Sequence, residues 1–252
     1  MNKWKHLFVL LMLLIFLTGL FVFLYPYLYG SVVNQQIQGN AEEFLSLVET
    51  NPYHPVESIP KSTAWLSEPQ ETPTQPYQKL LDAMVSYNEA IYAEAQVGLS
   101  DSDSYKAPSF SLADYGLESE TFGVLTIPVL DFEMPIFLGA TKQHLAEGVA
   151  HLSQTSLPIG GNNTNAVIAG HRGWRGAAYL RYIDQVKIGD EVIVTNLWGK
   201  LIYTVCEIKI IDPHEVEEIL IQPNRELLTL LTCHPYASGG RQRYLVICER
   251  TT

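Results

Sequence analysis

The stretch ELLTLLTCHPYASGGRQRYLVICE, residues 226–249, holds two apolar runs joined by a polar loop. Each run is rich in leucine, isoleucine, valine or threonine, as is typical of β-strands, and Pro and Gly punctuate the loop between them. Ten residues separate Cys233, at the end of the first run, from Arg243, at the head of the second. A loop of that length allows the two runs to pair as antiparallel strands. The stretch therefore predicts a β-hairpin.

The same pattern of short apolar and β-branched runs begins after Thr121. Gly, Pro and Asn separate the runs, which is typical of an all-β barrel or sandwich. Pro128 inside the first run predicts an edge position or a bulge. Two brief helical stretches are expected, at 142–148 and 177–183. The predicted strands are 122–130, 134–139, 165–170, 191–197, 200–211, 226–233 and 243–249.

A membrane anchor is predicted at the N-terminus. Residues 7–28 read LFVLLMLLIFLTGLFVFLYPYL, 22 residues without a charge, and a helix of that length crosses the ~30 Å hydrocarbon layer. Lys3 and Lys5 should remain cytoplasmic, which places the rest of the chain outside the cell. The alternative is a cleaved signal peptide. The apolar run exceeds the roughly 7–15 residues of such a peptide and no A-x-A site follows, so we favour a retained anchor.

Between the anchor and the β-rich region the chain is acidic. Residues 31–120 contain 14 acids and 3 bases, whereas residues 121–252 contain 13 acids and 11 bases. We expect a helix over 31–50 and an amphipathic helix over 79–97 with Gly98 as its stop signal. Leu80, Met84, Ile91 and Ala95 should form the apolar stripe of the second helix. Six prolines between 51 and 77 predict an extended linker.

Three regions are thus expected. Residues 1–30 form the cytoplasmic head and anchor, residues 31–120 form a helical and linker section with a loop near 100–113, and residues 121–252 form the β domain.

The composition excludes several classes of function. The chain has 252 residues with 16 Lys and Arg against 27 Asp and Glu, and a net charge of −11 argues against binding to nucleic acid. Its three cysteines are too few for a disulfide framework and form no C-x-x-C pair. No spacing of His, Cys and Asp resembles a metal site. We therefore expect neither a metal nor another cofactor.

A reactive cysteine needs a basic or cationic neighbour and a group that stabilises an oxyanion. Cys233 suits this role because it closes a predicted strand and enters a loop. Cys206 and Cys248 lie inside apolar runs and are interpreted as small buried residues.

His171 is the best-placed histidine, since it ends the predicted strand NAVIAG before the Gly-containing HRGWRG. His234 should point to the face opposite Cys233, because successive side chains of a strand alternate. Arg241 and Arg243 are both candidates for the oxyanion-stabilising role.

These residues carry a family resemblance. TLLTCHPYASGGRQRYLV resembles the T-L-x-T-C…R signature of sortases, the membrane-anchored cysteine transpeptidases of Gram-positive surfaces, and NTNAVIAGHRG resembles their histidine motif. VLTIPVLDFEMPIFLGAT, GVAHLSQTSLPIGG and IGDEVIV resemble the pilin-polymerising class C branch. The resemblance covers roughly residues 79–250 and implies a mainly β fold, an eight-stranded sortase-type barrel with short helices, behind an N-terminal helical section and one transmembrane helix.

The resemblance also implies roles for three residues. Cys233 would be the nucleophile, His171 its imidazolium partner and the general acid toward the leaving amine, and Arg243 rather than Arg241 the family arginine, which donates hydrogen bonds to the oxyanion.

Two departures from the class C pattern stand out. The loop SDSDSYKAPSF, residues 100–110, lacks the Asp-Pro-aromatic motif of the usual lid. An open cleft, or one covered loosely by Tyr105 or Phe110, is therefore expected. The sequence also stops at Thr252 where many relatives have a second membrane segment, so a single anchor is expected.

The expected function is cleavage of an LPXTG-like sorting signal between Thr and Gly, followed by transfer of the thioacyl group to a lysine amine of a pilin subunit. Pilins or other LPXTG-bearing surface proteins, and the membrane, are the expected partners. Two alternatives remain. One is a housekeeping-type sortase that anchors surface proteins to cell-wall peptidoglycan, and the other is a non-catalytic pilus assembly factor.

Overall fold

The computed structural model describes residues 2–50, 77–100, 107–174 and 176–251. Within these residues eight strands close into a barrel in the order β1-β2-β3-β4-β7-β8-β6-β5. This confirms the predicted eight-stranded barrel. The strands are β1 (Thr121–Ile127), β2 (Phe132–Leu138), β3 (Val149–His151), β4 (Thr164–Ala169), β5 (Glu191–Asn196), β6 (Gly199–Ile211), β7 (Glu226–His234) and β8 (Gln242–Arg250).

The barrel consists of two arcs of strands, β1 to β4 and β5 to β8, joined at two seams. At one seam β1 pairs antiparallel with β5, and at the other β4 pairs parallel with β7, with Thr164 opposite Glu226 and Ala169 opposite Leu231. The predicted hairpin is confirmed, since β7 and β8 pair antiparallel along their length.

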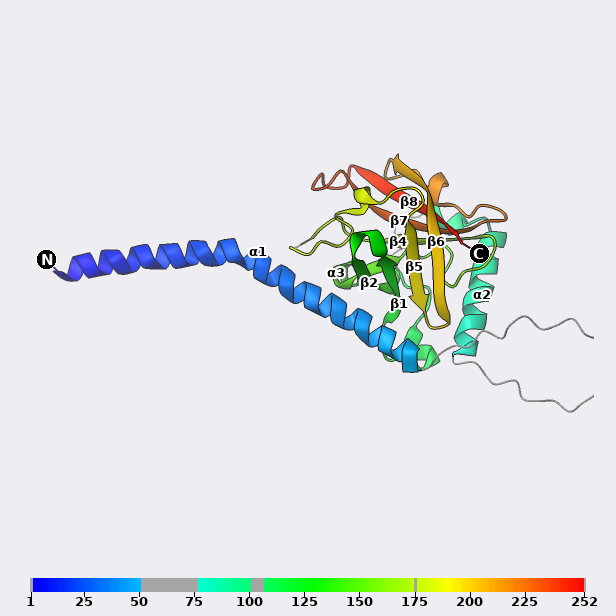
Figure 1. Ribbon diagram of the computed structural model, residues 1–252, viewed down its shortest axis with the longest axis horizontal. Coiled ribbons are helices and arrows are strands. Elements are labelled where there is room, and N and C mark those ends of the chain that lie inside the picture. The colour runs from blue at the N-terminus through cyan, green and yellow to red at the C-terminus, as the bar shows by residue number, and fades with distance from the viewer. Residues whose placement is uncertain (1, 51–76, 101–106, 175, 252) are drawn as a thin grey trace, which may run out of the picture.

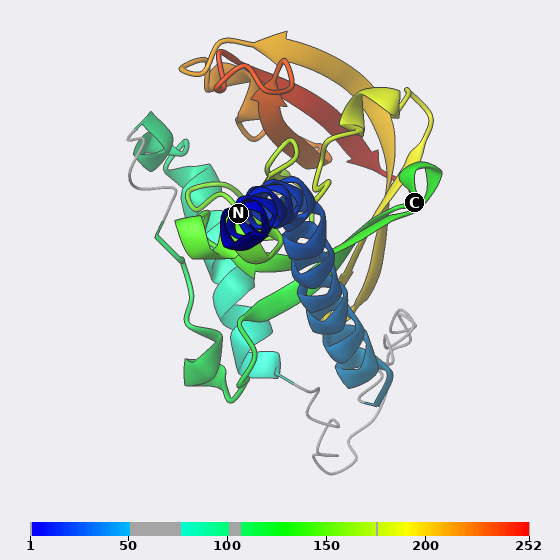
Figure 2. The ribbon, with the colours of Figure 1, turned by 90° about the vertical axis from the view of Figure 1, so that its left-hand side faces the viewer.

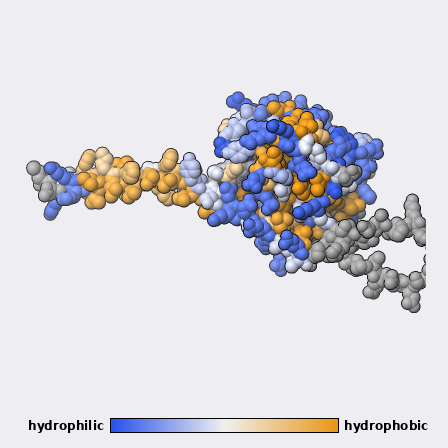
Figure 3. Space-filling view, viewed as in Figure 1, coloured by the Kyte–Doolittle hydropathy of each residue, from blue (hydrophilic) through white to orange (hydrophobic). Residues whose placement is uncertain are grey.

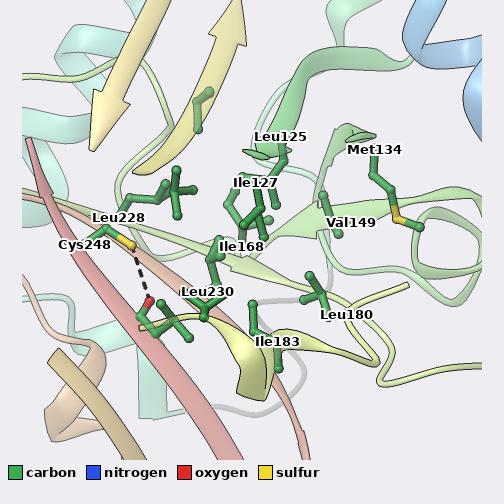
Figure 4. Packing of buried hydrophobic residues seen from close by; sticks show 14 of the residues in the cluster. Leu125, Ile127, Met134, Val149, Ile168, Leu180, Ile183, Leu228, Leu230 and Cys248 are labelled. Atoms are coloured by element: carbon green, nitrogen blue, oxygen red, sulfur yellow. Dashed lines mark hydrogen bonds between the residues drawn. The ribbon is translucent and has the colours of Figure 1, made fainter. Parts of the chain in front are cut away.

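Alternation along the strands fills the barrel with aliphatic side chains. Figure 4 shows how residues from both arcs meet inside, with the thiol of Cys248 donating toward the carbonyl of Val246 at 3.9 Å. Burying such side chains is worth about 1.5–3 kcal/mol each. The labelled members of this cluster are Leu125, Ile127, Met134, Val149, Ile168, Leu180, Ile183, Leu228, Leu230 and Cys248.

Helices surround the barrel. They are α1 (Asn2–Thr50), α2 (Gln78–Ala93) and α3 (Lys142–Glu147), with 3₁₀ turns at η1 (Val97–Ser100), η3 (Leu112–Tyr115), η4 (Pro128–Leu130), η5 (Ile183–Gln185) and η6 (Glu217–Ile219). Figure 1 shows α1 projecting far from the barrel, with a bend where the two meet. Pro26 lies inside α1, and a proline in a helix removes a hydrogen bond and favours a bend.

The projecting part of α1 is long and apolar enough to cross a membrane. Its most apolar 18-residue window has a mean hydropathy of 3.1 with none of its side chains buried in the structure. Figure 3 shows this part as a mainly hydrophobic surface, interrupted by a few paler residues before the helix reaches the barrel. No break separates the apolar segment from residues 31–50, so the expected boundary at residue 30 falls within one helix.

Beyond residue 30, α1 packs on the barrel. Ile37, Ala41 and Phe44 are buried, and they recur at the three- and four-residue spacing of one helix face. The helix predicted for 31–50 is therefore confirmed, as the second half of α1. In α2, Leu80, Met84 and Ile91 form the buried stripe, as expected.

Several predictions were wrong in detail. The expected helix at 177–183 is a turn, and only η5 follows it. α2 ends at Ala93 rather than near residue 97, because Ala95 and Gln96 have positive φ values, and Ala95 is exposed rather than on the buried stripe. β3 was not among the predicted strands.

Pro128 lies in η4, between β1 and β2, and not within a strand. The predicted linker over 51–77 falls almost wholly in 51–76, outside the described residues.

Candidate active site

A cavity of about 260 Å³ opens at the end of the barrel where β4 and β7 finish. Cys233, His171 and Arg243 lie at this cavity, whose walls are mainly apolar. The apolar walls include Leu99, Ala140, Leu145, Leu152, Ile211, Val216, Ile219 and Leu231. The three predicted site residues, one from the end of β4 and two from the β7–β8 hairpin, are thus brought to one cleft.

The register of the parallel seam explains how His171 reaches Cys233. Ala169 is opposite Leu231, and two residues further along each chain come His171 and Cys233. The seam continues past the strand, because the N–H of Gly170 donates to the carbonyl of Leu231 at 3.0 Å. The hydroxyl of Thr232 in turn donates to the carbonyl of Gly170 at 2.7 Å. Parallel strands end at the same edge, so both side chains face the same cleft.

The antiparallel hairpin places Arg243 directly opposite Cys233. Gly240 passes over both side chains. A Cβ atom on Gly240 would lie 3.2 Å from Arg243 Nη1 and 3.3 Å from Cys233 Sγ, so thiol and guanidinium share one small space. Arg243 Nη1 donates to the carbonyls of Gly240 at 2.7 Å and Gln242 at 3.1 Å. The loop thereby fixes the guanidinium beside the thiol.

His171 sits in an aromatic pocket. Its ring stacks on Trp174, with centroids 5.0 Å apart and an interplanar angle of 27°, and Tyr179 meets it edge-on at 5.7 Å. The Tyr179 hydroxyl donates to the carbonyl of Ala146 at 2.7 Å, and the N–H of Leu180 donates to the carbonyl of His171 at 2.9 Å. Partial burial lowers the pKa of His171 below its ordinary value. Burial thus disfavours the protonated imidazolium form of His171.

A second set of side chains lies on the opposite face, and sequence reasoning missed its centre, Arg172. Arg172 is buried, and its Nη1 donates to His234 Nδ1 at 2.7 Å while its Nη2 pairs with Asp184 at 2.9 Å. The guanidinium also lies 5.2 Å from the centre of the Tyr244 ring, which stacks on His234. His234 thus points away from Cys233, as predicted.

The members of this set directly follow the site residues in sequence. Arg172 follows His171, His234 follows Cys233, and Tyr244 follows Arg243. Alternation in extended chains puts neighbours on opposite faces. The sequence shows that Arg172, His234 and Tyr244 each directly follow a site residue. It does not show that these three side chains would contact one another.

The remaining cysteines differ from Cys233. Burial raises the pKa of the Cys248 thiol and, less completely, that of Cys206. Cys248 lies in the core as predicted, whereas Cys206 is only half-buried and its sulfur accepts a hydrogen bond from Arg225 at 3.6 Å. Neither lines the cavity.

Of the other candidates, Arg241 is exposed on the loop before β8, and Arg243 is the arginine at the cleft. Phe110 packs against Tyr87 at 5.7 Å and lines a different groove, so it does not cover the cleft. Tyr105 lies outside the described residues. Within those residues, no three His, Cys, Asp or Glu side chains gather as a metal-ligand set.

Known proteins support this architecture. The Sortase domain profile matches residues 125–251, which include β2 to β8 and all three site residues. Sortase D of Bacillus subtilis is 30% identical over 132 residues, covering 52% of this chain and 64% of the relative. Sortase A of Streptococcus agalactiae is 30% identical over 114 residues, covering 44% of this chain and 46% of the relative. The matches thus span about half to two thirds of these relatives.

Solved structures match over more of the chain. Sortase C1 of GBS Pilus Island 1 superposes with a TM-score of 0.67 at 28% identity, covering 86% of this chain and 92% of that one. Group B Streptococcus Pilus Island 1 sortase C2 has a TM-score of 0.60 at 30% identity, covering 69% and 99%. A domain profile across half the chain, together with a barrel of the same fold, shows that the chain belongs to the sortase family.

Proposed function

We propose that the chain is a membrane-anchored cysteine transpeptidase that cleaves an LPXTG-like sorting signal and transfers it to an amine. The observation that carries the proposal is the meeting of Cys233, His171 and Arg243 at one apolar cavity in a member of the sortase family. Nucleophile, proton carrier and oxyanion donor are the parts that acyl transfer through a thioester requires.

Chemistry begins at Cys233. The neutral imidazole of His171 takes the thiol proton, and the thiolate attacks the carbonyl carbon of the substrate threonine. A carbon–sulfur bond forms, and negative charge moves to the carbonyl oxygen. Arg243, opposite Cys233 and braced by two backbone carbonyls, stabilises that charge.

The intermediate then collapses. The bond between the threonine carbonyl and the glycine nitrogen breaks, and the His171 imidazolium gives its proton to the leaving amine. The threonine remains as a thioester on Cys233. An incoming amine attacks this thioester, His171 takes the excess proton, and the thiolate leaves as the new amide forms. No step requires a metal or another cofactor.

The cavity supports a substrate with apolar side chains near the scissile bond. Leucine and proline of a sorting signal suit walls such as Leu145, Ile219 and Leu231. Apolar walls also limit the access of water, which competes with the amine for the thioester. The solved relatives named for pilus islands favour a pilin lysine as the acceptor. The first alternative function is transfer of the sorting signal to cell-wall peptidoglycan. The second is a non-catalytic role in pilus assembly.

α1 supplies the proposed membrane attachment. Its apolar segment would span the bilayer with Lys3 and Lys5 on the cytoplasmic side, so the barrel lies outside the cell. There the barrel would meet sorting signals and acceptor amines at the outer membrane surface.

Mass spectrometry of the full chain in detergent tests the chemistry. Incubation with a sorting peptide should add the peptide's acyl mass to Cys233, and Cys233→Ala should abolish both the adduct and cleavage. Cys206→Ala is the matched control, because this cysteine is also half-buried but does not line the cleft. An unmodified Cys233 across sorting peptides, with cleavage retained in Cys233→Ala, would refute the proposal.

Purified pilin identifies the acceptor. A covalent ladder that depends on Cys233 supports pilin polymerisation, whereas peptide cleavage with no ladder, and transfer to a peptidoglycan amine, supports wall anchoring. Ladder formation that survives Cys233→Ala would indicate an assembly factor.

A further inference from the structure

α1 contacts the loop that carries His171 at a place where two glycines meet. A Cβ atom on Gly30 would lie 2.8 Å from both the carbonyl carbon and the carbonyl oxygen of Gly176, and one on Gly176 would meet the carbonyl oxygen of Pro26. Gly30 is buried although the helix before it is exposed. Only glycine lets two backbones approach this closely.

Gly176 lies in a tight turn between Trp174 and Ala177. The N–H of Trp174 donates to the carbonyl of Ala177 at 3.0 Å, and the N–H of Ala177 donates back at 2.9 Å. The turn therefore moves with Trp174, the residue whose indole stacks on His171. Figure 2, which looks along α1 toward the barrel, shows the loop after β4 beside the helix.

The same face of α1 continues onto the barrel. Ile37, two turns after Gly30, belongs to the core cluster that also contains Ala177, and Val33 and Trp174 pack against that cluster. The turn therefore contacts the helix through Gly176, which remains exposed, and the barrel core through the buried Ala177. A shift of the turn would disturb one of these contacts, because closely packed atoms transmit strain.

We propose that Gly30 and Gly176 form a positioning contact through which the membrane-anchoring helix holds the ring of His171 at the mouth of the cleft. Gly30, Gly176 and Trp174 are positioning residues in this scheme. They act on His171, and the catalytic consequence rests on the proposed function. The bilayer is then a partner of the active site, because it fixes the helix on which the turn rests.

Two Gly→Ala variants of the full chain in detergent micelles test the contact. Gly30→Ala places a methyl group against the Gly176 backbone, whereas Gly39→Ala, on the same helix, meets nothing within 4 Å. Both changes raise helix propensity equally. Gly30→Ala should lower kcat/KM for a sorting peptide by about tenfold to a hundredfold, since small misplacements of a reacting group have such effects. Gly39→Ala should match the unchanged chain.

NMR of the His171 ring tests the contact without reference to activity. In the unchanged chain the ring signal, assigned with His171→Gln, should show the ring-current shift of the stacked indole and a lowered pKa. Gly30→Ala should reduce both effects, and Gly39→Ala should preserve them. Identical His171 spectra for all three chains would overturn the inference, even if Cys233 forms acyl-enzyme. A chain that forms no acyl-enzyme would refute the proposed function but leave this readout intact.

Trp174→Leu tests the route to His171 and serves as a second variant should Gly30→Ala disturb folding. It should shift the titration of His171 as Gly30→Ala does. The double variant, Gly30→Ala with Trp174→Leu, should have a kcat/KM no lower than that of the less active single variant. Additive effects would show that Gly30 acts elsewhere. An unchanged His171 titration in Trp174→Leu would overturn the route altogether.

Discussion

Arg172 links the backbones that carry the three site residues. Its guanidinium contacts His234 and Tyr244, each next in sequence to a site residue, and Asp184 neutralises it from the loop before β5. Because arginine only donates, His234 Nδ1 must be the acceptor and carries no proton. The seam between β4 and β7 is therefore tied on the face that continues the barrel interior, while the reacting groups occupy the opposite, outer face that lines the cavity.

Arg172→Ala should lower kcat by about tenfold or more, because His171 and Cys233 lose their common brace. KM should change little, since Arg172 does not line the cavity. Arg172→Lys keeps the charge but cannot bind His234 and Asp184 in the same fork geometry, so it should recover only part of kcat. Peptide-cleavage kinetics measure both constants. Arg181→Ala, at a guanidinium that lies over the exposed Tyr236 ring, is the surface control. Equal kinetics for Arg172→Ala and Arg181→Ala would contradict the brace.

His151 sets a pH limit on stability. Complete burial lowers its pKa from 6.5 to about 4, against the opposing effect of hydrogen bonds to the carbonyls of Thr155 and Ser156. Between pH 6.5 and about pH 4, His151 is protonated in the unfolded chain but stays neutral in the folded chain. The free energy of unfolding is therefore unaffected by His151 above pH 6.5. As the pH drops toward 4, the titration of this residue lowers it by about 3 kcal/mol. Urea unfolding across this range should show the loss, and His151→Gln should flatten it. Parallel curves for the two chains would contradict the assignment.

At the scale of single residues, the sequence supports the choice of Cys233, His171 and Arg243, because each stands at the end of an apolar run. Their meeting is then a matter of register, which the structure supplies. Arg172 gave no comparable signal. An arginine after a strand is ordinary, and its burial depends on the hairpin and the loop before β5 coming together.

Among the elements, local pattern failed where tertiary contacts decide the backbone. β3 has three residues, too few to show alternation. Residues 177–183 have helical spacing, but Tyr179 adopts a positive φ while its ring packs edge-on against His171. α2 stops early because Gln96 leaves the helix. Its side chain donates to the carbonyl of Gln154 at 3.1 Å and accepts from the N–H of Ile221 at 2.6 Å.

α2 is fastened to the barrel through Asn88. The buried side chain accepts from the N–H of Leu157 at 2.7 Å and donates to the carbonyl of the same residue at 3.3 Å. Asn88→Ala leaves both backbone groups buried without these partners, so the free energy of unfolding should fall by about 1–3 kcal/mol. Glu89→Ala, at the next residue but on the exposed face of α2, should change the free energy of unfolding by no more than about 0.5 kcal/mol. Chemical denaturation of both variants decides, and equal stabilities would refute the role of Asn88.

In the whole molecule, α1 has two uses along one uninterrupted helix. Its first half is apolar and exposed, and its second half packs on the barrel. The sequence predicted each half, because a charge-free run and a sparse apolar stripe are local patterns. The division expected at residue 30 lies inside this helix. Which surface each half packs against is a tertiary property that the local patterns do not contain.

Shortened chains should separate these two uses. A chain that begins at residue 31 keeps Ile37, Ala41 and Phe44 and should fold as a soluble barrel. A chain that begins at residue 51 exposes the surface those side chains cover. Its free energy of unfolding should be lower by about 5 kcal/mol, which is the burial free energy of one small and two large apolar side chains. Urea unfolding and light scattering measure the difference, and equal stability of the two chains would show that α1 does not contribute to the fold.

The two-arc construction of the barrel has a consequence for biosynthesis. His171 follows the last strand of the first arc, while Cys233 and Arg243 lie in the second. These groups meet only when the seam between β4 and β7 closes, a pairing of residues about 60 apart in sequence that forms slowly. On the proposed chemistry, a nascent or partly folded chain at the membrane carries an ordinary, unactivated thiol. Cys233 thus becomes reactive only when folding is complete and His171 and Arg243 lie beside it.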